Sequence, residues 1–145
     1  MQDSYDTIIV GTDGSPDSAR AVEWATGLAA RLDSRVVIVH AVPLLDHLPG
    51  KPAVIAAEVR VEIQTLLETT WSEPLRQRGV QHSCVMEDGP PLLAIPRVAE
   101  RVSAHLIVVA SHGAGNSAGL LVGSTSHGLI QTAAIPVVVI PTQSR

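Results

Sequence analysis

Aromatic residues are scarce in this chain of 145 residues, which has no Phe, one Tyr and two Trp. A hydrophobic core must therefore be built from Val, Ile, Leu and Ala, because 46% of the residues are hydrophobic but only 2% are aromatic. This is the composition of an α/β protein with β-branched strands and Ala-rich helices, and it excludes a disordered chain. The length suits one domain, residues 1–145, around a single substantial core.

Cysteine and long apolar runs are also nearly absent. Cys84 is the only cysteine, which excludes an internal disulfide and a metal cluster built from cysteines. No apolar run reaches the ~18 residues of a membrane span. The acidic stretch before Gly11 is typical of neither a signal peptide nor a transit peptide. We therefore expect a cytoplasmic protein with no membrane partner.

The balance of charge excludes another class of partner. With a formal net charge of −4 and Lys51 as the only lysine, the chain is not expected to bind nucleic acid. The six histidines show neither the HxH nor the HxxxH spacing of a recognisable metal site. One of them, His40, ends an apolar run and is expected to be a hydrogen-bonded core residue.

Apolar runs predict the strands of a parallel sheet. Four runs are continuous, as expected for strands covered on both faces, and a fifth alternates more and suits a position nearer an edge. The four are Thr7–Gly11, Arg35–Val42, His105–Ser111 and Ile135–Pro141, and the fifth is Val80–Asp88. Helical periodicity predicts four helices between them: Ser15–Leu32, Pro52–Gly79 with a kink or break at Pro74, Pro91–Ala104 and Ser124–Ala134. This alternation predicts a doubly wound sheet, which binds ligands at the carboxyl ends of its strands where the strand order reverses.

The stretch Ala110–Ser126 is rich in glycine and begins at the end of one of the predicted strands. It is not a P-loop, since Lys51 lies far away, and Gly113–Gly119 has the wrong spacing for a dinucleotide fingerprint. A helix is expected to begin at Ser124, so free backbone N–H groups and two hydroxyls could hold an anion there. The residues alone leave two interpretations open: a plain loop or a phosphate-binding loop.

The spacing within this stretch carries a resemblance to a known family. The stretch follows the pattern G-x2-G-x9-G-[ST] except at the first glycine, where Ala110 stands. The matching residues are Gly113 and, after nine further residues, Gly123-Ser124. Together with the opening IIVGTDGSPDSARAVEWA and the closing AIPVVVIP, these residues resemble the universal stress protein family over almost the entire chain. The resemblance implies that residues 1–145 are a single universal stress protein domain.

What the resemblance implies extends to fold, ligand and assembly. The implied fold is a five-stranded parallel sheet of order 3-2-1-4-5 with four helices, similar to the adenine nucleotide alpha hydrolase fold. The implied ligand is ATP or a related adenine nucleotide, accompanied by a divalent ion such as Mg²⁺ or Mn²⁺. The implied assembly is a homodimer through the C-terminal strand Pro136–Ile140.

The resemblance also implies the residues of a site. Asp13 matches an acidic residue beside the adenosine portion of the nucleotide, and Ala41 matches a position whose backbone edges the adenine pocket. The stretch Gly113–Thr125 matches the segment whose amides and hydroxyls hold the phosphates. The predicted nucleotide-binding residues are Gly11, Thr12, Asp13, Ala41, Val42, Ala110, Ser111, His112, Gly113, Gly123, Ser124 and Thr125.

Two alternative functions remain open. Ala110 places a methyl group where the family's backbone approaches the nucleotide, which favours a dimeric interaction or regulatory module that binds no nucleotide. The second alternative is a weak nucleotide hydrolase. Ser111, His112 and Asp13 are its candidate triad, but adjacent Ser and His side chains rarely point at each other and no GxSxG elbow is present. Since no Lys or Arg lies near the loop to stabilise transferred phosphate, no catalytic residue is predicted. Asp13 has a second, compatible interpretation as the acceptor of an Asx turn before Ser15.

Overall fold

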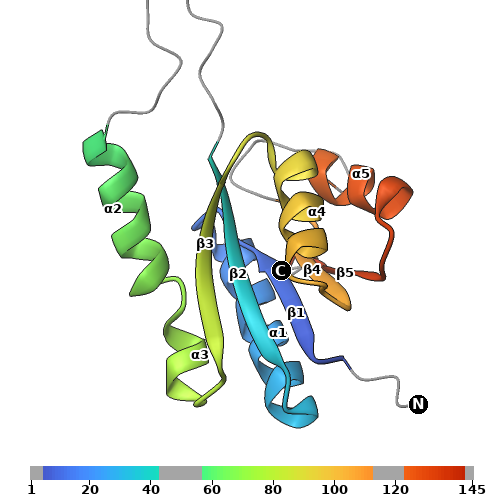
Figure 1. Ribbon diagram of the computed structural model, residues 1–145, viewed down its shortest axis with the longest axis horizontal. Coiled ribbons are helices and arrows are strands. Elements are labelled where there is room, and N and C mark those ends of the chain that lie inside the picture. Colours follow the sequence, from blue (N-terminus) through green and yellow to red (C-terminus); the bar gives the residue numbers. More distant parts are fainter. Residues whose placement is uncertain (1–4, 43–56, 113–122, 143–145) are drawn as a thin grey trace, which may run out of the picture.

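The computed structural model describes residues 5–42, 57–112 and 123–142. In this part of the chain five parallel strands form one sheet in the order β3-β2-β1-β4-β5, with helices on both faces (Figure 1). The strands are β1 (Thr7–Gly11), β2 (Arg35–Val42), β3 (His82–Asp88), β4 (Leu106–Ala110) and β5 (Val137–Ile140). The predicted fold class and strand order are confirmed, and β3 is an edge strand as its alternation indicated.

The first strand lies at the centre of the sheet because its side chains are apolar on both faces. Ile8, Ile9 and Val10 are all 0% exposed. Ile9 is paired in register with Val37 of β2 on one side and with Ile107 of β4 on the other. The strand order reverses between β1 and β4, so this is the switch point at which a doubly wound sheet binds its ligands.

The helices largely follow the predicted segments. They are α1 (Pro16–Leu32), α2 (Ala57–Glu68), α3 (Glu73–Gln77), α4 (Pro91–Arg101) and α5 (Ser124–Thr132). The second predicted helix is thus broken into α2 and α3, and the break precedes Pro74 because the chain turns where the Trp71 N–H donates to the carbonyl of Leu66 at 2.9 Å. The first residues of that predicted helix, 52–56, lie outside the described residues.

Alternate side chains of the central strands supply two separate cores. Ile8 and Val10 point to the face covered by α1 and by the buried leucines of α2 and α3, Leu67 and Leu75. Ile9 points to the opposite face, which α4 and α5 cover. In Figure 1, α2 stands beyond the edge strand β3, and Leu67 is the buried residue that fastens it to the sheet.

Candidate functional site

A cleft opens at the carboxyl ends of β1, β2 and β4, at the predicted switch point. Its volume is about 110 Å³, which is several times the ~10–15 Å³ that one water molecule requires. The first residues of α4 and α5 complete its walls. The described residues that line it are Gly11, Thr12, Asp13, Ser18, Val39, His40, Ala41, Pro91, Ile95, Val109, Ala110, His112 and Thr125.

The floor of the cleft is apolar and closely packed. A Cβ atom at Gly11 would lie 2.9 Å from Cδ1 of Ile95 and 3.4 Å from Cγ1 of Val109. Any larger residue at position 11 would therefore push the Ile95 side chain of α4 out of its place beneath the cleft. The absence of a side chain at the end of β1 is what lets α4 approach the sheet here.

The turn after β1 holds Asp13 in a fixed orientation. Asp13 Oδ1 accepts the backbone N–H of Ser15 at 2.9 Å, which is the Asx turn that the sequence allows. Ser15 in turn caps α1, because its hydroxyl oxygen accepts the N–H of Ser18 at 3.2 Å. The Ser18 hydroxyl oxygen accepts the Asp13 N–H at 3.3 Å. The carboxylate is thus presented to the cleft by a turn whose polar groups bond one another.

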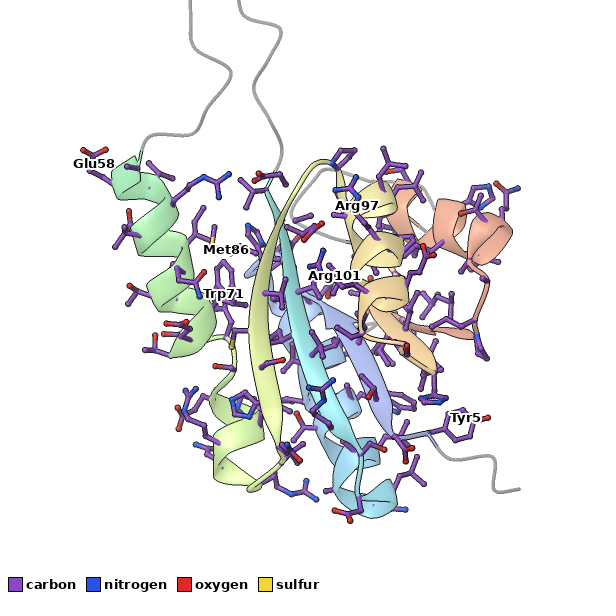
Figure 2. All side chains as sticks on the ribbon, viewed as in Figure 1. Tyr5, Glu58, Trp71, Met86, Arg97 and Arg101 are labelled. Atoms are coloured by element: carbon purple, nitrogen blue, oxygen red, sulfur yellow. The ribbon has the colours of Figure 1, made fainter. Side chains whose placement is uncertain are left out.

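His40 and Trp71 support this turn from the other side. The Nδ1 atom of His40 lies 2.8 Å from the carbonyl oxygen of Thr12, so Nδ1 carries the proton and donates. The His40 ring lies 5.3 Å from the Trp71 ring, centroid to centroid, at an angle of 58°. A Cβ atom at Gly14 would lie 2.4 Å from Cζ2 of Trp71, so the indole packs directly on the turn. Figure 2 shows Trp71 beside Met86, between α2 and the sheet.

The side chains at the end of β4 and just after it point in two directions. Ala110 and His112 line the cleft. Ser111 does not line the cleft and is only 5% exposed. Its hydroxyl instead lies 3.1 Å from the hydroxyl of Thr142, beyond the end of β5. Ser111 Oγ also lies 3.2 Å from Nδ1 of His112, so these adjacent side chains do meet, contrary to the general expectation. The buried serine hydroxyl nevertheless does not reach the cleft, which weighs against it as a nucleophile.

Helix α5 begins against the backbone of this segment. The Gly123 N–H donates to the carbonyl of Ser111 at 2.5 Å, and the Ser126 hydroxyl donates to the same carbonyl at 3.0 Å. A Cβ atom at Gly123 would lie 2.8 Å from that oxygen. Only glycine therefore lets the start of α5 lie so close to β4, which brings Thr125 to the wall of the cleft.

The structure brings most of the predicted residues together. Seven of them line the cleft: Gly11, Thr12, Asp13, Ala41, Ala110, His112 and Thr125. Four others do not line it: Ser111, Gly123 and Val42 are buried, and Ser124 is exposed at the start of α5. The remaining one, Gly113, lies outside the described residues. Each assignment to a nucleotide stays a prediction.

Other lining residues were not among those predicted. His40 was expected to be hydrogen-bonded, as it is, but it is half-buried and also faces the cleft. Pro91 and Ile95 enter from the start of α4. The order of the elements could have indicated them, because every helix that follows a strand of a parallel sheet begins at the same edge as the cleft.

The electrostatic character of the cleft is set by few ionisable groups. Among the described residues that line it, Asp13 is the only carboxylate, and His40 and His112 are the only basic side chains. In residues 5–42, 57–112 and 123–142, no three His, Cys, Asp or Glu side chains are grouped so as to hold a metal ion. An anion that enters this cleft would meet hydroxyl groups and imidazole rings.

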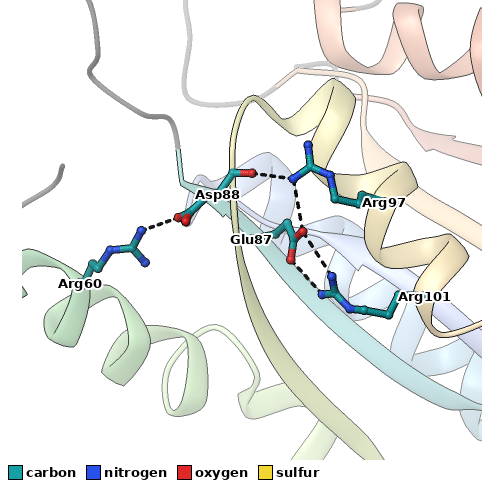
Figure 3. A network of polar contacts seen from close by, with 5 residues as sticks. All are labelled: Arg60, Glu87, Asp88, Arg97 and Arg101. Carbon is teal, nitrogen blue, oxygen red and sulfur yellow. Dashed lines mark hydrogen bonds and ion pairs between the residues drawn. The ribbon is translucent and has the colours of Figure 1, made fainter. Parts of the chain in front are cut away.

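A second polar network joins the edge strand to α4 and α2 (Figure 3). Glu87 of β3 is 12% exposed and accepts from Arg101 at 2.8 Å and from Arg97 at 3.3 Å. The hydrogen bond from Arg101 is the main cause that holds the pKa of Glu87 below its ordinary value. The neighbouring Asp88 pairs with Arg60 of α2. Because Arg97 and Arg101 are on the helix that carries Ile95, this network fixes α4 beside the cleft.

Comparisons with known proteins agree with the resemblance in the sequence. Residues 4–141 match the sequence profile of the universal stress protein family. A universal stress protein of Mycobacterium tuberculosis is 33% identical over 135 residues, which cover 91% of this chain and 44% of that protein. The chain therefore spans less than half the length of this relative. Within the described residues, no helix has both the length and the apolar character needed to cross a bilayer.

Solved structures show the same fold. A universal stress protein crystallised in complex with cAMP has a TM-score of 0.77 and 27% identity, covering 97% of this chain and 99% of the other. The universal stress protein of Archaeoglobus fulgidus in complex with dAMP has a TM-score of 0.71 and 24% identity, covering 94% and 98%. At that identity the second likeness concerns the fold alone. Since the family match extends over nearly the whole sequence and the fold is shared, this chain belongs to the universal stress protein family.

Proposed function

We propose that the chain binds ATP or a related adenine nucleotide in the cleft and acts in the cytoplasm in the response to stress. The observation that carries the proposal is that the Asp13 turn and the start of α5 face each other across one cleft, although they come from opposite ends of the sequence. The relative of known structure that binds cAMP supports an adenine nucleotide as the ligand.

The proposed pose follows from the chemistry of the two walls. The adenosine portion lies between the Asp13 turn and the backbone of Ala41, above the apolar floor made by Gly11 and Ile95. The phosphates lie toward Thr125 and the amino end of α5, where the helix dipole favours an anion. An accompanying Mg²⁺ or Mn²⁺ is held by the phosphates and water, as Mg²⁺ usually is, and supplies positive charge there.

The test is to identify what the purified protein carries and then to titrate it. Acid extraction should release an adenine nucleotide, and calorimetry with ATP and Mg²⁺ should give saturable heat. Asp13→Asn keeps the acceptor of the Asx turn but loses the charge, so it should weaken binding while the fold persists. Asp33→Asn is the matched control, because Asp33 caps the opposite end of α1.

Ala110 decides between this proposal and its alternative. The side chain lines the cleft, and its methyl group occupies space that the family's first motif glycine leaves open. Ala110→Gly should therefore raise the affinity for ATP. If neither the wild type nor Ala110→Gly binds ATP up to about millimolar concentration, the nucleotide proposal is wrong. The chain is then better described as an interaction or regulatory module.

We also propose that residues 1–145 form one domain and pair through the strand Pro136–Ile140. β5 is at the edge of the described sheet, and its valines Val137–Val139 are half-exposed. The carbonyls of Pro136 and Ile140 accept the N–H groups of Ile107 in β4 and of Ser111 just after it, so the N–H and C=O of Val139 face outward. Val139→Pro should therefore abolish a dimer seen by light scattering without breaking the β4–β5 ladder. A wild-type protein that is monomeric at all concentrations would contradict the proposal.

A further inference from the structure

Three polar atoms meet where the segment after β4 passes the end of β5. Nδ1 of His112 lies 3.0 Å from Oγ1 of Thr142 and 3.2 Å from Oγ of Ser111. The two hydroxyl oxygens are 3.1 Å apart, and the Thr142 N–H donates to Ser111 Oγ at 3.1 Å. Thr142, the second residue after β5, is therefore bonded through its backbone and its side chain to the residues that follow β4.

Helix α1 holds Thr142 in this position from outside. The Thr142 hydroxyl donates to Oδ2 of Asp17, in the first turn of α1, at 3.4 Å. Arg20, one turn further along α1, donates to the carbonyl of Pro141 at 2.8 Å. Residues 141 and 142 are thus fastened between α1 and the segment after β4.

The direction of the hydrogen bonds follows from the number of protons available. Thr142 has one hydroxyl proton, and the carboxylate of Asp17 can only accept it. The lone pairs of Thr142 Oγ1 then accept from Nδ1 of His112, which fixes Nδ1 as the protonated nitrogen. His112 lines the cleft, and Thr142 and Ser111 both contribute to the orientation of its ring there. A phosphate oxygen would meet the ring through Nε2, which donates when the ring is protonated.

We propose that Thr142, seated on Asp17, is a positioning residue that orients His112 toward the phosphates of a nucleotide in the cleft. This inference rests on the function proposed above. It is supported by the shortage of positive charge, since His40 and His112 are the only basic side chains among the described residues that line the cleft. It also connects the cleft to the edge strand, because Thr142 is the second residue after the end of β5.

Titration of ATP and of adenosine separates this role from a general effect on binding. Removing the hydroxyl in Thr142→Val should lower the affinity for ATP about three- to tenfold, the range for one hydrogen bond, and leave adenosine unchanged. Thr142→Ser should restore the affinity for ATP. Thr65→Val is the matched control, because the Thr65 hydroxyl bonds its own helix α2 at an exposed site.

A double-mutant cycle shows whether Thr142 acts through His112. In a His112→Ala background, Thr142→Val should cause no further loss. The inference is overturned if Thr142→Val leaves the ratio of ATP to adenosine affinity at its wild-type value, whether both affinities are unchanged or both fall equally. It is also overturned if Thr142→Val still lowers the affinity for ATP in the His112→Ala background. Wild-type protein that binds neither ligand instead overturns the proposed function itself. Thr142 is exposed, so we expect every variant of it to melt near the wild-type temperature.

Discussion

The glycine in the Asp13 turn is where a single methyl group should cost the most stability. Gly14 has φ +81°, in the left-handed region, and a Cβ there would lie 2.4 Å from Cζ2 of Trp71. A side chain in that backbone conformation costs roughly 1–2 kcal/mol, and overpacking against a half-buried ring costs roughly 1–3 kcal/mol. Gly14→Ala should therefore destabilise the fold by about 2–5 kcal/mol.

Three other glycines separate the two causes. Gly79 has φ +65° but open space around its Cβ position, so Gly79→Ala should cost roughly the 1–2 kcal/mol of the backbone conformation alone. Gly123 has an ordinary φ of −69° and a carbonyl oxygen 2.8 Å from its Cβ position, so its cost is crowding alone. Gly27 lies within α1 with nothing near, and Gly27→Ala should stabilise by about 1 kcal/mol.

The measurement is unfolding in urea and by heat, followed by circular dichroism at one protein concentration. Each kcal/mol should shift the melting temperature by roughly 2–4 °C in a chain of this size. In a Trp71→Leu background the crowding at Gly14 is relieved, so Gly14→Ala should cost less there. An equal cost in both backgrounds would show that Trp71 does not confine the turn. A destabilised Gly27→Ala would refute the reasoning from open space altogether.

Three further perturbations test the core, the polar network and the cysteine. Leu67 is 0% exposed, so Leu67→Ala should cost about 2–5 kcal/mol in urea unfolding, whereas Leu66→Ala, at a position 36% exposed, should cost much less. The lowered pKa of Glu87 means that its pairing with Arg101 stabilises the fold above pH 4.5, the ordinary value, and that this stabilisation is lost as the pH falls through the folded pKa. Glu87→Gln should therefore flatten the acid side of the stability profile, and an unchanged profile would contradict this. Burial raises the pKa of the Cys84 thiol, so the native protein should react with a thiol reagent more slowly than the urea-unfolded protein at the same pH.

The sheet was predictable because its pattern is local. Four strands are continuous apolar runs, and the more alternating run Val80–Asp88 contains the half-buried edge strand β3. The run Ile135–Pro141 was expected to be covered on both faces, but it contains β5, which is half-exposed at the other edge. Pro74 predicts a break in the second helix, but this proline lies after the residues at which the chain turns. The chain turns earlier, after Glu68, so that Trp71 can pack on Gly14, and this contact joins residues far apart in the sequence.

The candidate site was predictable in outline for the same reason. Asp13 follows one predicted strand and Ala110 lies at the end of another, so strand order alone brings them to one edge of the sheet. The roles of Ser111 and Thr142 were not predictable, because their hydroxyls bond each other across a tertiary contact. The meeting of Ser111 with His112 runs against the usual preference of adjacent residues, and a third residue, Thr142, fixes it.

The central position of β1 has a consequence for the protein during its synthesis. β1 is synthesised before the other strands of the sheet. Its neighbour β4, and Thr125 on the opposite wall of the cleft, follow about a hundred residues later in the sequence. A nascent chain that ends before Thr125 contains the Asp13 turn but lacks the opposite wall of the cleft. A ligand of the cleft can therefore stabilise only chains translated past Thr125, and cannot assist the folding of earlier intermediates.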